Sequence, residues 1–163
     1  MNEGKRDILI FPKFSNINNI QNIRLNYDKL ATLIPPHITL AFPFSNNMCD
    51  EDLIGKMEEI LTNTEPFKVS FKGITLSQDK YIFLNCIEGN NEIIKLHDEI
   101  YSEILNKHNE KVVNYIPHIT LGKTEEIGKL KNFDDIFTTI VDEIIIERIG
   151  EKEESIIIKK IQL

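Results

Sequence analysis

Short apolar runs separated by polar turns predict a chain of alternating strands and helices. Runs rich in isoleucine, leucine, phenylalanine and valine, bounded by proline or by polar turn residues, are typical of strands. The tripeptide "SQD" at 77–79 is expected to reverse the chain between two of them. The pattern predicts strands at 7–13, 37–44, 67–76, 80–88, 141–149 and 154–162, and one more directly after Pro117.

Apolar residues spaced by three and four positions predict helices between these strands. The clearest case is 91–108, where Ile93, Leu96, Ile100 and Ile104 form one apolar stripe. Weaker patterns predict helices at 16–33, which two prolines should end, at 49–63 and at 125–137.

The order of these elements repeats within the chain. Strand, helix, PHITL strand, helix and strand run from about 7 to 76, and again from about 80 to 149, with a closing strand at 154–162. An offset of 81 residues between the two PHITL pentapeptides is close to half of the 163-residue chain. We therefore expect an internal repeat folded into one two-lobed α+β domain over 1–163, with a pseudo-twofold axis and a central cleft between the PHITL strands.

Within each PHITL strand the polar and apolar side chains should face opposite ways. Side chains two positions apart share a face of a strand, so His37 and Thr39 lie together, as do His118 and Thr120. Two imidazoles across a cleft can act as one acid and one base near neutral pH. Threonine hydroxyls beside them can donate to the oxygens of a phosphate diester. The constellation therefore predicts phosphodiester chemistry that needs no metal.

The pair of motifs is more specific than either copy alone. With four histidines and nine threonines in the chain, chance gives roughly 0.2 His-x-Thr triplets. Two occur, in identical pentapeptides and at matching points of the repeat. The alternative is that duplication has simply carried along two structural strand histidines. Duplication alone, however, would preserve the apolar pattern more readily than the polar face.

Charge and composition narrow the function classes. The formal net charge is −7, which disfavours a protein that grips long nucleic acid along its backbone. No apolar run is long enough to span a bilayer, and the apolar stretch that ends at Lys13 is too short for a secretion signal. Cys49 and Cys86 form no metal-ligand or disulfide pattern, and no P-loop is present. We expect a cytoplasmic monomer without metal, cofactor or membrane partner.

The sequences "HITL" at 37–40 and "HITL" at 118–121 resemble the signature of the 2H phosphoesterase superfamily, which includes bacterial 2′-5′ RNA ligases and cyclic phosphodiesterases. The resemblance covers nearly the whole chain. It implies a bilobal fold of two antiparallel sheets with helices on the outside and a central cleft. It also implies metal-independent chemistry on 2′,3′-cyclic phosphates or 2′-5′ linkages, with a cyclic nucleotide or a short RNA end as substrate. By this resemblance His37 and His118 are the acid–base pair, and Thr39 and Thr120 bind phosphate.

Two further residues are weaker candidates. Many members of the superfamily carry a basic residue shortly after the second motif, and Lys123 could take that part. Strict alternation would put Lys123 on the face of Leu121, so a bulge or the strand end is needed to bring it to the site. Tyr115 could stack on a base, or else pack against the helix before it. His97 is expected on the flank of that helix and His108 at its end, both outside the site.

Two rival functions remain open at this point. One is an RNA-end or tRNA-end binding module that turns over slowly, and the other is an interaction protein built on a decayed enzyme. A hydrolase of cyclic-oligonucleotide signals would carry the same motif. Intact histidine and threonine at all four positions disfavours decay, because one substitution would be enough to stop proton transfer.

Overall fold

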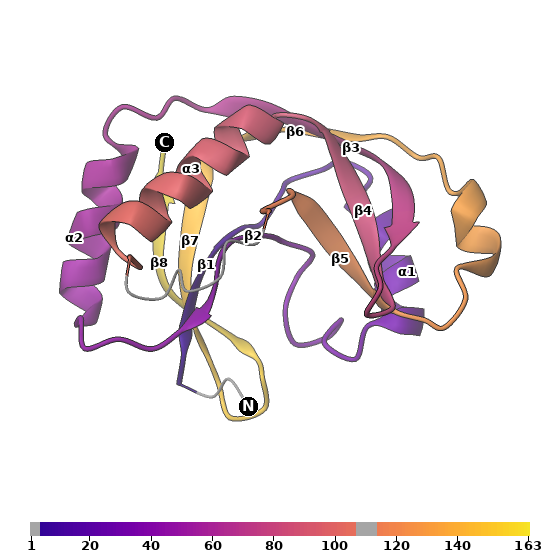
Figure 1. Cartoon of the computed structure of the whole chain (residues 1–163), viewed down its shortest axis with the longest axis horizontal. Helices are drawn as coiled ribbons and strands as arrows, with labels where there is room; N and C mark the ends of the chain where they lie inside the picture. Colours follow the sequence, from indigo (N-terminus) through magenta and orange to yellow (C-terminus); the bar gives the residue numbers. More distant parts are fainter. Residues whose placement is uncertain (1–3, 107–113) are drawn as a thin grey trace.

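The computed structural model describes residues 4–106 and 114–163 and shows an α+β fold. Within these residues, eight strands form one antiparallel sheet, accompanied by three α-helices and one 3₁₀ helix (Figure 1). In chain order the elements are β1 (Arg6–Ile10), α1 (Ile17–Tyr27), β2 (Ile38–Phe44), α2 (Asp50–Leu61), β3 (Phe67–Leu76), β4 (Tyr81–Glu88), α3 (Asn90–Glu103), β5 (His118–Lys123), η1 (Gly128–Asn132), β6 (Phe137–Val141), β7 (Glu143–Ile149) and β8 (Ser155–Gln162).

The sheet is continuous, and this corrects the expectation of two separate sheets. Its strand order is β6-β3-β4-β5-β2-β1-β7-β8, with the two PHITL strands next to each other at the centre. These two strands are joined by a single registered pair, Ile38 with Ile119. One pair is enough to make the ladder continuous, yet it leaves the junction narrow, and the sheet curls along its length (Figure 1).

The expected repeat units do not each build one half of this sheet. β3, which closes the first unit, pairs with β4 and β6 of the second. β7, near the end of the second unit, pairs with β1 of the first. The two units are thus interleaved in the sheet. The PHITL strands are hydrogen-bonded neighbours and do not face each other from separate sheets.

Helices cover one face of the sheet and create the main core. α1 packs on β5, α3 packs on β2, and α2 packs on α3 and β8 (Figure 1). The apolar residues of both motifs are fully buried in this core: Ile38, Leu40, Ile119 and Leu121. Since alternate side chains point to opposite faces, the histidines and threonines lie on the face away from this core.

Several element boundaries differ from the sequence-based expectations. The first helix ends at Tyr27 and not at 33, because the following loop folds back and buries Ile34 against Leu9 and Ile145. α3 ends at Glu103, and the last two positions of the helix expected at 91–108, including His108, lie outside the described residues. The helix expected at 125–137 is only the short η1.

Strand β6 was missed from the sequence. Its residues, Phe137–Val141, read FTTIV, and β-branched residues of this kind favour strands when a neighbour is available. The neighbour is β3, which pairs with β6 over five registered positions and starts 70 residues earlier in the chain. A pairing over such a sequence separation leaves no signal in local periodicity.

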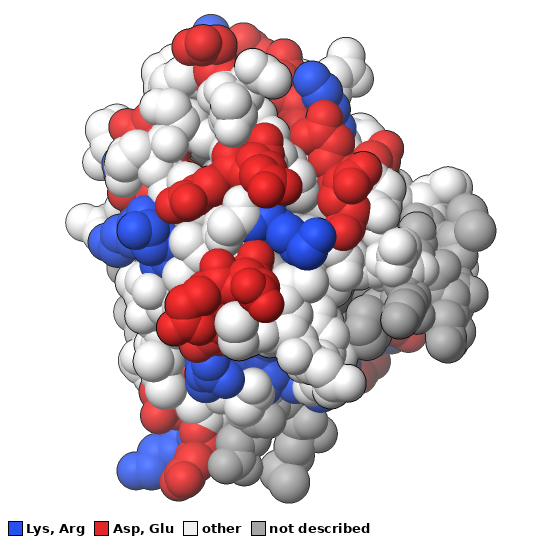
Figure 2. All heavy atoms as spheres, turned by 90° about the vertical axis from the view of Figure 1, so that its left-hand side faces the viewer, with Lys and Arg blue, Asp and Glu red and all other residues white. Residues whose placement is uncertain are grey.

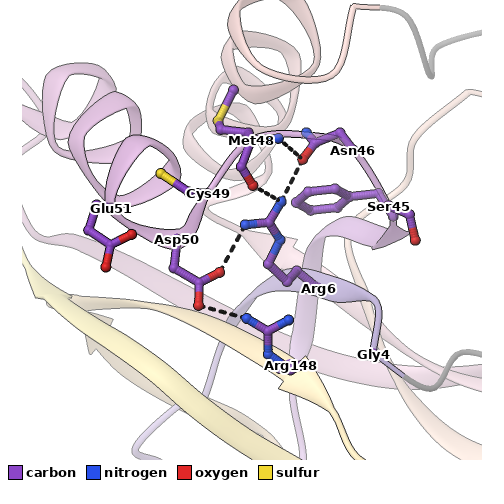
Figure 3. A pocket seen from close by; sticks show the side chains of 10 residues that line it. Gly4, Arg6, Ser45, Asn46, Met48, Cys49, Asp50, Glu51 and Arg148 are labelled. Atoms are coloured by element: carbon purple, nitrogen blue, oxygen red, sulfur yellow. Dashed lines mark hydrogen bonds and ion pairs between the residues drawn. The ribbon is translucent and has the colours of Figure 1, made fainter.

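A buried arginine fixes the start of α2 to the sheet (Figure 3). Arg6 on β1 donates hydrogen bonds to Asp50 (2.9 Å), to Asn46 (2.5 Å) and to the carbonyl of Met48 (2.7 Å). Arg148 on β7 donates to the other carboxylate oxygen of Asp50 at 2.6 Å. These groups line a pocket of about 430 Å³. The Arg6 guanidinium already has these three partners. We therefore assign the polar groups of this pocket a structural role, which is to hold the start of α2 on the sheet.

Among the described residues, no helix is both long and apolar enough to cross a membrane. Figure 2 shows the face that carries α2, where acidic side chains are numerous and basic ones are scattered between them. The first turn of this helix alone contributes Asp50, Glu51 and Asp52. The described part of this face therefore offers no continuous basic surface to a nucleic-acid backbone.

Candidate active site

The two motifs meet on one face of the sheet. β2 and β5 are antiparallel and Ile38 is opposite Ile119, so the register sets His37 opposite Thr120 and Thr39 opposite His118. Direct cross-strand neighbours have Cβ atoms about 5 Å apart and diagonal neighbours roughly 7–8 Å apart. All four side chains are partly exposed. The four predicted residues thus flank the single registered pair on one face of the sheet, with the histidines on one diagonal and the threonines on the other.

The two imidazole rings are held in the same way. The Nδ1 atom of His37 lies 2.9 Å from the carbonyl oxygen of Pro35, and the Nδ1 atom of His118 lies 2.8 Å from the carbonyl oxygen of Ile116. A carbonyl can only accept, so each Nδ1 carries the proton and donates it. Each neutral ring therefore presents an unprotonated Nε2 that can take up a proton. This backbone contact was not foreseen from the sequence.

Burial favours the neutral form of both rings. It lowers the pKa of His37 to about 4, against the opposing hydrogen bond to Pro35, and the nearby charges of Arg24 and His118 lower it further, while Asp28 raises it. Burial also lowers the pKa of His118, again against a backbone hydrogen bond. Near neutral pH the free site therefore holds two neutral imidazoles, each able to act as a base at Nε2.

A bulge in each motif strand turns the next residue toward the site. On β5, Thr120 pairs with Phe83 but Gly122 pairs with Ile82, so Leu121 is the extra residue. After this bulge, Lys123 lies on the same face as His118 and Thr120. The bulge that Lys123 was expected to need in order to reach this face is therefore present.

β2 has the same irregularity at the same place. Thr39 pairs with Leu9 but Ala41 pairs with Ile8, which turns Phe42 toward the face of His37 and Thr39. The Phe42 side chain is 51% exposed. It occupies the position equivalent to Lys123 in the other copy. Sequence reasoning missed it, although the matched spacing in "HITLAF" and "HITLGK" was a signal.

Glycine is required at the second bulge. Gly122 has φ +133°, and a Cβ added there would lie 2.3 Å from the carbonyl carbon and oxygen of Tyr27. The C-terminal end of α1 therefore rests directly on β5. This end carries the fully buried Arg24, which donates to Gln21 and Asp28, each at 3.0 Å. The close approach brings the charges of Arg24 and Asp28 within reach of His37.

Aromatic side chains on β4 extend the site beyond His118. The ring of Phe83 packs on the ring of His118, with centroids 3.9 Å apart. Tyr81 lies parallel to Phe83 at 6.3 Å, and the Nζ atom of Lys123 lies 4.4 Å from the centre of the Tyr81 ring. These aromatic neighbours were not predicted, because they depend on the pairing of β4 with β5.

Tyr115 packs between α3 and the first motif strand, so its ring is engaged within the protein. It stacks on His97 of α3 with centroids 3.9 Å apart and donates a hydrogen bond from its hydroxyl to the carbonyl of Thr39 at 2.7 Å. Burial raises the pKa of Tyr115. Of the two placements considered for this residue, the structure has the packing against the helix.

The motif face provides few ligands for a metal. Among residues 4–106 and 114–163, no group of three or more histidine, cysteine, aspartate or glutamate side chains is arranged to hold a metal ion. The array itself contributes two imidazoles and two hydroxyls. Imidazoles of this kind can transfer protons at Nε2, and threonine hydroxyls can donate hydrogen bonds.

Comparison with known proteins identifies the family. The family model described as the 2′-5′ RNA ligase superfamily matches residues 12–142, which include both motifs and most of the sheet. The chain belongs to this superfamily. A protein of Geobacillus kaustophilus named "Putative phosphoesterase GK0864" is 34% identical over 125 residues, covering 73% of this chain and 69% of the relative. A Bacillus anthracis protein named "Putative phosphoesterase" is 28% identical over 150 residues, covering 85% and 84% of the two chains.

Solved structures share the fold of this superfamily member at low sequence identity. E. coli LigT in complex with 3′-AMP has a TM-score of 0.71 and 15% identity, with 98% of both chains covered. The protein TT0787 of Thermus thermophilus has a TM-score of 0.71 and 14% identity, with 98% of this chain and 97% of that chain covered. The likeness extends over the whole chain and shows that the curled sheet is a fold shared with these proteins.

Proposed function

We propose that this chain is a metal-independent phosphodiesterase that opens 2′,3′-cyclic phosphates, or cleaves 2′-5′ linkages, at RNA ends or in nucleotides. The observation that carries the proposal is the array of two His-x-Thr triplets on adjacent strands, with both Nδ1 atoms committed to carbonyls. In this proposal both Nε2 atoms act on one shared substrate position. Two such nitrogens supply the base and the acid that in-line displacement at phosphorus needs.

The reaction follows from this geometry. One neutral Nε2 takes a proton from water while the water oxygen bonds to phosphorus. The bond from phosphorus to one ribose oxygen breaks, and the second imidazole, protonated at Nε2, gives its proton to that departing oxygen. Thr39 and Thr120 donate hydrogen bonds to the non-bridging oxygens as negative charge grows on them. The product is a phosphate monoester, and the two rings have exchanged their protonation states.

The environments of the rings favour different roles. Burial lowers the pKa of His37 to about 4, and the charge of Arg24 lowers it further, whereas the lowered pKa of His118 reflects burial against a backbone hydrogen bond to Ile116. We assign His37 as the base that activates water and His118 as the acid. A bound phosphate diester brings a negative charge beside both rings and raises their pKa, so the acid can be protonated in the complex.

Two findings on other proteins support a nucleotide substrate. LigT has been crystallised with 3′-AMP and with phosphate, and the relatives named above bear the name phosphoesterase. On this chain, the exposed Phe42, three residues after Thr39 on β2, offers a surface on which the base of the terminal nucleoside can stack. The formal net charge of −7 favours a short substrate over a long one.

The direct test is turnover in EDTA of 2′,3′-cyclic AMP and of a linear 2′-5′ dinucleotide. The rate should be bell-shaped in pH, and His37→Ala and His118→Ala should each lower kcat by about 100-fold or more. Lys95→Gln, which changes an exposed side chain on α3 that pairs with Glu99, is the control variant and should stay within a few-fold of the unaltered protein. No turnover of either compound, together with micromolar binding of an RNA end, would favour the binding module instead.

A further inference from the structure

We propose that a cluster of three ring side chains beside β2 positions the first motif for the reaction. The cluster comprises His97 and Tyr101 of α3 and Tyr115, which precedes β5. It holds the bulge of β2 and, through this bulge, the side chains of Thr39 and Phe42. The inference rests on the proposed function and assigns the residues that orient one half of that site.

Two tyrosine hydroxyls hold the backbone of β2 on either side of its bulge. The carbonyl of Thr39 accepts a hydrogen bond from Tyr115 at 2.7 Å, and the amide of Phe42 donates one to Tyr101 at 3.3 Å. The bulge lies between these two positions, at Leu40. Since the bulge turns Phe42 toward the motif face, the two hydroxyls fix how Thr39 and Phe42 are presented there.

His97 joins the two tyrosines into one unit. Its ring stacks on Tyr115 with centroids 3.9 Å apart and an interplanar angle of 7°, and its centroid lies 4.5 Å from that of Tyr101. All three side chains are partly buried, so contact between the rings restricts the direction of each hydroxyl. Burial raises the pKa of both tyrosines. Both hydroxyls therefore stay protonated near neutral pH, and Tyr115 keeps the proton that it donates.

The second motif strand is held by a different contact. α1 rests on β5 through its C-terminal backbone, which lies against Gly122. The equivalent position on β2 is Ala41, and α3, which packs on this strand, contacts its backbone through the Tyr101 hydroxyl. The two motifs thus have separate supports. A change in the tyrosines should accordingly affect Thr39 and leave Thr120 in place.

The two hydrogen bonds predict different kinetic effects on turnover of 2′,3′-cyclic AMP in EDTA. In the proposed reaction Thr39 acts on charge that grows in the transition state, so its displacement lowers kcat. Phe42 offers stacking surface that is the same before and during the reaction, so its displacement raises KM. Tyr115→Phe should therefore lower kcat about fivefold to tenfold, and Tyr101→Phe should raise KM about threefold with kcat within about twofold.

A double-mutant cycle separates positioning from a general loss of stability. In a Thr39→Val background, Tyr115→Phe should change kcat by about twofold or less, because the hydroxyl through which it acts is gone. In a Thr120→Val background it should again lower kcat about fivefold to tenfold. Tyr27→Phe, which removes the hydroxyl of an exposed ring at the end of α1, is the matched control and should leave kcat and KM unchanged. Equal losses from Tyr115→Phe in both threonine backgrounds overturn the proposal.

Binding of inorganic sulfate, measured by titration calorimetry, repeats the cycle without chemistry. Tyr115→Phe should weaken sulfate binding about threefold when Thr39 is present and leave it unchanged in Thr39→Val. Turnover of 2′,3′-cyclic AMP with additive effects in both cycles would leave the proposed function standing and overturn the positioning role. Absence of turnover with coupled effects on sulfate binding would do the reverse. Should Tyr115→Phe fail to fold, Tyr101→Phe decides, and an unchanged KM overturns the proposal.

Discussion

At the scale of single residues, the two histidines share one hydrogen-bonding arrangement but differ in their surroundings. Each donates from Nδ1 to the carbonyl two residues earlier, just before a buried proline. His37 additionally lies within reach of Arg24 and Asp28, while His118 packs against Phe83. Identical pentapeptides therefore carry chemically distinct rings, and this difference allows a division into acid and base.

The lowered pKa of His37 has a measurable effect on stability. Its pKa is about 4 in the folded protein and 6.5 without the fold, so the unfolded chain binds a proton first as the pH falls. The stabilising contribution is present above pH 6.5 and is lost as the pH falls toward 4. The free energy of unfolding, measured by urea titration at pH 7.5, 6 and 5, should fall more steeply for the unaltered protein than for His37→Asn. Parallel pH dependences would contradict an imidazole that the fold holds in its neutral form.

A second titrating group acts in the opposite direction. Asp7 faces Glu147 across β1 and β7, both are buried, and burial together with this neighbour raises the pKa of Asp7 from 3.8 to about 9. The folded protein therefore holds a proton that the unfolded chain releases, and stability is lost as the pH rises from 3.8 through about 9. We expect Asp7→Asn to be more stable relative to the unaltered protein at pH 8.5 than at pH 5.5 in the same urea titration. An equal difference at both values would show that the pair carries no excess proton.

Local alternation was sufficient to predict the four motif side chains, because residues two apart share a strand face whatever the strand pairs with. It could not predict Phe83 or Phe42, since one depends on which strand lies beside β5 and the other on a bulge in β2. The packing of Tyr115 could not be decided from the local sequence, because its ring stacks on His97 of α3. The proposed reacting groups could thus be chosen from the sequence, whereas the long-range strand pairing around them is visible only in the fold.

At the scale of elements, the contact between α1 and β5 sets the geometry of the second motif. A side chain at Gly122 would meet the backbone of Tyr27, and φ +133° is unfavourable for any residue with a Cβ. The helix boundaries and the bulge are therefore coupled. The sequence suggested that a bulge was needed for Lys123 to take part, but nothing local showed that α1 would lie over it.

We expect Gly122→Ala to destabilise the protein by about 2–4 kcal/mol, through positive-φ strain and displacement of α1. Gly55→Ala in α2 is the matched control, because a Cβ there has no neighbour within 4 Å and alanine favours a helix by about 0.5–1 kcal/mol. Urea unfolding of both variants measures the two effects, which should have opposite signs. A Gly122→Ala variant as stable as the unaltered protein would mean that the close approach of α1 is not retained in solution.

At the scale of the whole molecule, the proposed anion site lies in a protein with a net charge of −7. The net charge does not attract an anionic substrate, so the proposal requires binding by local groups: the two imidazoles, the threonines and Lys123. Since an anion beside the rings favours their protonated forms, binding of an anion of constant charge should strengthen as the pH falls.

Sulfate provides this test, because its charge does not change between pH 5 and pH 8. A ligand at 100 times its Kd stabilises a folded protein by about 2.7 kcal/mol, so the rise in Tm on adding sulfate should be larger at pH 5 than at pH 8. Sulfate also stabilises proteins generally through exclusion from their surfaces. The double variant His37→Ala with His118→Ala retains that general effect, and subtracting its Tm shift isolates the site. If the sulfate-induced Tm shift of the unaltered protein exceeds that of the double variant by the same amount at both pH values, protonated imidazoles do not bind the anion. The proposed phosphodiester chemistry would then lack its positive charge.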